Sequence, residues 1–143
     1  MSITTALRTY ALADEYLSDQ LGERIRPVHL EQGDDDAAIA VTYQTISNTP
    51  DEGLTEDSDH ETNRIQFDVY SDDEALAGTV AKKLRQRLRS AHGSLDVDGE
   101  AVVFCTGCST GSGIRDLSAL APIDGSANWK HRLSFDMMVS FNT

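Results

Sequence analysis

The stretch that decides the fold is Arg64–Leu88, with the sequence RIQFDVYSDDEALAGTVAKKLRQRL. In its first half, Ile65, Phe67 and Val69 alternate with residues that point the other way, which is the period of a half-buried β-strand. After Ser71 the period becomes helical, and one apolar stripe follows, made of Leu76, Ala77, Val80, Ala81, Leu84 and Leu88. The sequence therefore predicts a strand that runs directly into an amphipathic helix.

The ends of this helix carry their own signals. Ser71 and Glu74 have the spacing of a capping box, in which each side chain bonds the backbone N–H of the other residue. Acidic residues follow Ser71, and arginines gather near the other end, as the helix dipole favours. We expect the helix to begin at Ser71 and to stop before Gly93.

The flanking sequence completes an α+β fold with a mostly antiparallel sheet, two helices packed on it, and one long projecting hairpin. Helical spacing marks residues 3–20, and Pro27 confines the extended piece at 24–30 to a sheet edge or a strand start. Further strands are expected at 38–46, at 95–97 and 101–105 around an Asp98-Gly99 turn, and at 133–141. A chain of 143 residues fits a single domain, 1–143.

Residues 47–63 form a polar excursion between two predicted strands. This stretch has no lysine or arginine and only one apolar residue, Leu54. Loops of this length inside a compact domain are uncommon and are often functional. We expect a projecting acidic hairpin that contacts a partner through Asp51, Glu52, Leu54, Glu56, Asp57, Asp59 and Glu61.

Charge excludes several classes of function. The net charge is −12, so contact with nucleic acid phosphates or an anionic membrane would be repulsive.

No apolar run is long enough to span a bilayer, and the N-terminal sequence lacks the order of a secretory signal. The only compact group of positive charge lies on the central helix, where it is either a solvated face or a patch for an acidic partner: Lys82, Lys83, Arg85, Arg87 and Arg89.

Cys105 and Cys108 have C-x-x-C spacing but do not follow the pattern of a redox or zinc site. A redox pair sits at a helix N-terminus, whereas this pair ends a strand and leads into glycines and serines. A zinc site needs two further ligands, for which only His92 and His131 are available on paper. Two cysteines also make no disulfide framework, which fits synthesis in a reducing compartment.

Other motifs fail on a required residue. Asp57, Asp59 and Glu61 alternate as in a calcium loop, but Thr62 stands at the glycine position. The link 107–113 is rich in glycine yet has no Gly-Lys-Ser/Thr, so we interpret it as a flexible hairpin rather than a phosphate cradle. No histidine has a triad partner, and we expect neither catalysis nor a cofactor.

Five segments in order resemble the tail-completion, or tail-terminator, family of long-tailed viruses. They are LRTYALADEYLSDQL, GERIRPVHL, AVTYQTIS, NRIQFDVYS running into DDEALAGTVAKKLRQRL, and HRLSFDMMVSF. The chain departs from the family pattern at the acidic excursion 47–63 and at the cysteine-glycine link 105–113, both of which lie where loops vary.

This resemblance implies a structural protein of the virion tail or neck, made in the host cytoplasm and without enzymatic activity. It implies a homo-oligomeric ring, usually a hexamer, that caps the head-proximal end of the tail tube. Its expected partners are further copies of itself, the tail tube protein and the head-tail connector protein. DNA would pass through the ring without specific binding, as an acidic wall favours.

Two alternatives stay open from the sequence. The first is another ring component of the neck or tail tube. The second belongs to a different class and is a small metal or redox protein that uses Cys105 and Cys108.

The composition of the charged residues predicts that the stability of the fold depends on salt concentration. Aspartate outnumbers glutamate by 16 to 8, and arginine outnumbers lysine by 9 to 3. Such a composition is either halophilic or that of an ordinary acidic protein. If it is halophilic, lowering salt from molar to dilute concentration exposes carboxylate repulsion and lowers the free energy of unfolding, measured by urea titration at each salt concentration. Equal stability at both extremes would contradict this prediction.

Overall fold

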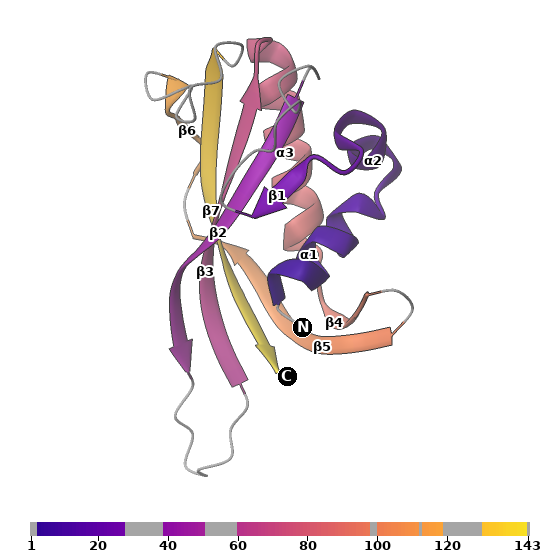
Figure 1. Ribbon diagram of the computed structural model, residues 1–143. Helices are drawn as coiled ribbons and strands as arrows, with labels where there is room; N and C mark the ends of the chain where they lie inside the picture. The colour runs from indigo at the N-terminus through magenta and orange to yellow at the C-terminus, as the bar shows by residue number, and fades with distance from the viewer. Residues whose placement is uncertain are drawn as a thin grey trace.

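The computed structural model describes residues 3–27, 39–50, 60–97, 100–111, 113–118 and 130–142. They form one mixed sheet with the helices on one side of it (Figure 1), which confirms the predicted α+β class. The strand order is β1-β2-β3-β7-β5-β4, and β6 pairs with β7 beyond the end of β5. Within the described ranges, no helix is long and apolar enough to cross a membrane. The elements are α1 (Ile3–Leu12), α2 (Glu15–Leu21), β1 (Ile25–Pro27), β2 (Ile39–Pro50), β3 (His60–Ser71), α3 (Glu74–Arg89), β4 (Gly93–Val97), β5 (Glu100–Thr110), β6 (Arg115–Asp116) and β7 (His131–Asn142).

The centre of the sheet is the antiparallel pair β3 and β7. Their register is unbroken from His60 opposite Asn142 to Ser71 opposite His131. Phe67 stacks on Phe135 across this pair, with ring centroids 5.5 Å apart and an angle of 15° between the planes. The predicted alternation on both strands therefore holds, and the apolar side faces the helices.

The helix α3 buries the predicted stripe: Ala77, Val80, Ala81, Leu84 and Leu88 are buried, and Leu76 packs at the edge of the core. The predicted capping box is wrong. Ser71 still belongs to β3, and its hydroxyl accepts from the Asp73 N–H. Asp73 is the N-cap, because its Oδ1 accepts from the N–H groups of Ala75 and Leu76. At the other end the C-cap is Ser90, and Gly93, at φ 85°, opens β4.

The N-terminal helix expected over 3–20 is divided in two. Asp14 interrupts it with an extended backbone, and its side chain accepts from the Leu17 N–H, so it caps a new helix. Both halves bury apolar residues against the core, among them Leu7, Leu17 and Leu21. The periodicity predicted helix correctly over both halves, but an N-cap in mid-pattern changes the direction of the chain.

Two polar stretches, one expected as a projecting hairpin and the other as a flexible link, are strands in part. Within the excursion 47–63, Ser47–Pro50 pair with Glu61–Arg64 beyond a bulge near Thr45. β7 continues alongside β3, and Thr62 bonds Ser140 between hydroxyl oxygens 3.0 Å apart. The link after Cys105 is likewise not a flexible hairpin, because Gly107–Thr110 pair with β7. In both places pairing with a neighbouring strand, rather than burial of apolar side chains, accounts for the strand.

Leu84→Ala tests the orientation of α3. Leu84 is fully buried, so the substitution removes apolar contacts and leaves a cavity. We expect the free energy of unfolding to fall by ~2–5 kcal/mol in chemical denaturation. Gln86→Ala, at an exposed position of the same helix, is the matched control and changes stability by less than about 0.5 kcal/mol. Similar small losses of unfolding free energy in both variants would show that Leu84 does not face the core.

Candidate assembly surfaces

The first candidate surface is the end of the sheet where the last residues of β2 lie beside the first residues of β3 and the last residues of β7 (Figure 1). Of the seven predicted contact residues, the structure describes only Glu61, which pairs with Pro50 on one side and Phe141 on the other. Its side chain is half-buried. The others lie outside the described residues: Asp51, Glu52, Leu54, Glu56, Asp57 and Asp59.

The predicted basic patch on α3 is not one surface. Lys83 and Arg87 lie on the flank that faces the N-terminal helices. The Arg87 guanidinium carbon is 3.8 Å from the centre of the Tyr10 ring, and its Nε donates to the Tyr10 carbonyl at 3.1 Å. The Lys83 Nζ lies 5.8 Å from the centre of the Tyr16 ring. These two cations therefore hold α3 against α1 and α2.

The other basic residues share the opposite flank of α3. Lys82, Arg85 and Arg89 are four, seven and eleven residues beyond Gly78, which places all of them on the face that carries this glycine. Lys82 and Arg89 are exposed. The buried Nε of Arg85 has no hydrogen-bond acceptor among the described residues. Positive charge is thus available for a partner on this flank, whereas on the other flank Arg87 is held against Tyr10.

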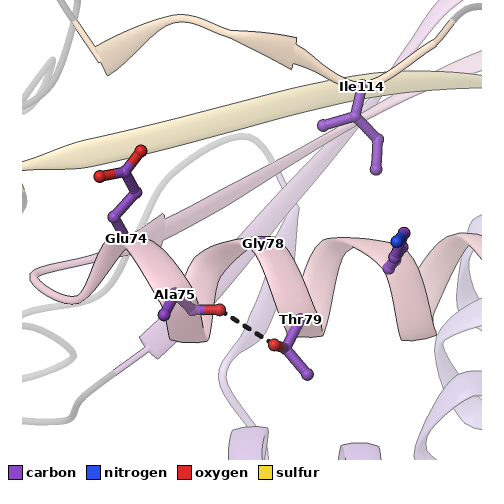
Figure 2. A pocket seen from close by; sticks show the side chains of 6 residues that line it. Glu74, Ala75, Gly78, Thr79 and Ile114 are labelled. Carbon is purple, nitrogen blue, oxygen red and sulfur yellow. Dashed lines mark hydrogen bonds between the residues drawn. The ribbon is translucent and has the colours of Figure 1, made fainter.

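An open groove of about 590 Å³ runs along the same flank. Figure 2 shows Ile114, in the segment before β6, pointing toward α3 from the other side of the groove. The floor of the groove consists of small and apolar residues. Glu74 and Lys82 place opposite charges at its two ends. The lining residues are Glu74, Ala75, Gly78, Thr79, Lys82 and Ile114. No sequence pattern predicts this groove, since Ile114 is distant in sequence from α3.

The face of the sheet away from the helices contains buried charge. Asp136 is almost fully buried and accepts from Arg64 through Oδ2 and from Arg115 through Oδ1, each at 2.8 Å. Arg115 also donates to the Ser134 hydroxyl at 3.2 Å. Because the guanidinium groups remain partly exposed, the carboxylate is neutralised while the arginines keep contact with solvent. This cluster joins β3, β6 and β7.

A second pair continues this network along the sheet. Arg132 Nε lies 3.3 Å from Asp68 Oδ1, and Gln66 donates to both oxygens of the same carboxylate. Both charged side chains of this pair are buried. The alternation of β3 and β7 predicted that these residues face away from the helices, but not that opposite charges would be adjacent. Fixed pairs of this kind give a rigid platform rather than a reactive site.

The cysteine pair faces the apolar core. Cys105 lies opposite Phe141 and Cys108 opposite Val139 on β7, and both contact the core cluster. Burial raises the pKa of the Cys108 thiol to about 12, and it raises the pKa of Cys105 as well. Such thiols disfavour the thiolate form that redox chemistry and metal binding require.

The histidines considered as zinc ligands do not complete this pair. His131 is at the opposite end of β7, ten residues from Phe141, which corresponds to ~33 Å along a strand. His92 is close in sequence to Cys105's acceptor, the Ala91 carbonyl, but its own side chain is exposed. Among the described residues, no three His, Cys, Asp or Glu side chains are grouped so as to hold a metal ion.

Comparison with known proteins gives a likeness of fold. No protein-family model matches the chain, and no curated protein matches it by sequence. Among solved structures, a chain of the virion of a native gene transfer agent particle superposes with a TM-score of 0.68. The alignment covers 99% of this chain and 96% of that chain, at 14% sequence identity. The whole chain therefore shares its fold with a component of that particle.

Thiol reactivity tests the environment of the cysteines. With its pKa near 12, Cys108 holds roughly a thousandfold less thiolate at pH 8 than an ordinary cysteine. We expect the native protein to react with an aromatic disulfide reagent at least ~100-fold more slowly than the urea-unfolded protein, followed by absorbance. Equal rates, or stoichiometric zinc in the purified protein, would restore the metal or redox alternative.

Proposed function

We propose that the chain is a structural protein of a virus-like particle that forms a ring at the head-proximal end of a tail tube. There it ends tube polymerisation and joins the tail to the head connector protein. The observation that carries this proposal is the shared fold over nearly the full length of a gene transfer agent virion component. The ordered resemblance of five segments to tail-terminator proteins supports the finer role.

The geometry is suited to assembly rather than to catalysis. A closed ring needs two different surfaces on each subunit, because each copy contacts its neighbour head to tail. Two candidates for such surfaces lie at separate places on the molecule: the end of the sheet where β2 ends and β3 begins, and the groove beside α3. The buried ion pairs on the other sheet face keep the scaffold between them rigid.

Net charge is consistent with the passage of DNA. With a net charge of −12, a ring of these subunits repels phosphates along its channel. The genome would slide through without sticking. Four basic side chains already interact within the subunit. Arg87 and Lys83 lie over tyrosine rings, and Arg64 and Arg115 pair with Asp136.

Tube assembly in the presence of this protein tests the proposal. The probe is the tail tube protein of the same virus, polymerised alone and with increasing amounts of this chain, and tube lengths are measured by negative-stain electron microscopy. We expect shorter tubes, each with one end closed by a ring that has a central hole. Leu84→Ala, whose core is weakened, serves as the control for an unfolded additive.

Rings that leave tube length unchanged would contradict the terminator role and favour another neck component. Monomers at every salt concentration would contradict the ring itself.

A further inference from the structure

The contacts of the described subunit give no reason for a glycine at position 78. Gly78 lies in the interior of α3, where glycine is unfavourable relative to alanine because it restricts more backbone freedom on folding. Its backbone is helical and is not one of the positive-φ glycines, which are Gly22 and Gly93. A Cβ built at Gly78 would meet nothing within 4 Å. No contact in the described subunit therefore requires a glycine, and the open space above it is the groove.

We propose that this groove receives residues 51–59 of a second copy of this chain. The segment reads DEGLTEDSD, with five carboxylates around a single leucine, Leu54. The groove offers a small apolar floor with Lys82 at one end and Glu74 at the other. Arg85 and Arg89 follow Lys82 about one and two turns further along the same flank of α3, beyond the groove itself. In molar salt the Debye length is ~3 Å, so charge acts only at contact, and burial of Leu54 against the floor then matters more.

Residues 51–59 are too short to reach the groove of their own copy. β3 has 12 residues and rises by ~3.3 Å for each, so ~36 Å of strand separates His60 from Ser71. α3 begins three residues after Ser71, and Gly78 is only ~6 Å along it from Glu74. Gly78 therefore remains ~30 Å from His60 even if α3 runs straight back along β3 (Figure 1).

The segment 51–59 leaves the sheet at Pro50 and returns at His60. Its middle can extend no more than ~17 Å from these ends, about half of the distance required. The contact is consequently between copies and is heterologous, since one copy donates the segment and the other the groove. Repetition of such a contact generates a closed ring or a filament, so the inference deepens the proposed ring by naming its interface.

Disulfide trapping tests the contact directly. Leu54→Cys and Gly78→Cys are introduced together, and the protein is oxidised gently in molar salt. The native cysteines, Cys105 and Cys108, are not expected to form disulfides under these conditions. Both face the core and hold little thiolate. We expect a ladder of covalent multimers on a denaturing gel that ends at the ring number, whereas each single variant gives none beyond dimers. Absence of the ladder while rings persist would overturn this interface and leave the proposed function standing.

A bulky side chain in the groove gives an independent readout. Gly78→Leu fills the space above α3 without meeting other atoms of its own subunit at Cβ, so the subunit folds and its thermal midpoint does not fall. We expect ring formation to need at least tenfold more protein than in the parent chain, measured by light scattering. Asp19→Leu places the same side chain at an exposed position of α2, none of whose residues lines the groove, and leaves assembly unchanged. Equal assembly of the two variants would overturn the proposal.

Discussion

The continuous pairing of β3 with β7 is the constraint on which the rest of the structure depends. It runs from His60 opposite Asn142 to Ser71 opposite His131, and its central contact is the stack of Phe67 on Phe135. Because α3 begins three residues after Ser71, the helix is tied to this pair and packs on both of its strands. β2 and β5 then pair along the two outer edges. The length of β7 also allows polar residues of β3 and β5 to remain in strands where they have few apolar contacts.

The elements that the sequence predicted well are those whose own side chains are buried. The alternation at 65–69 and 133–141 and the stripe on α3 all face one core. The predictions are wrong where an element depends on pairing with a neighbouring strand or on a hydrogen bond from a single side chain. Asp14 caps a new helix within a continuous helical pattern, and Asp73 rather than Ser71 caps α3. Ser47–Pro50 form a strand through their pairing with β3, which no local pattern of apolar residues records.

The candidate site was predictable only in outline. The acidic character of 51–59 and the basic character of α3 are visible in the sequence. The division of the basic residues is not, because it depends on where Tyr10 and Tyr16 lie. The groove needs Ile114, which the pairing of β6 with β7 brings near α3. Likewise, Asp136 meets Arg64 and Arg115 only because three separate segments become adjacent in the sheet.

The resulting picture is of an α+β subunit with two candidate assembly surfaces. We propose that copies of the chain associate through them into a closed ring. Light scattering coupled to size-exclusion chromatography in molar salt tests this claim most directly. The account predicts one species of fixed mass, six times the 15.6 kDa subunit, that does not change on tenfold dilution. A single species at 15.6 kDa across all concentrations and salt conditions would contradict it.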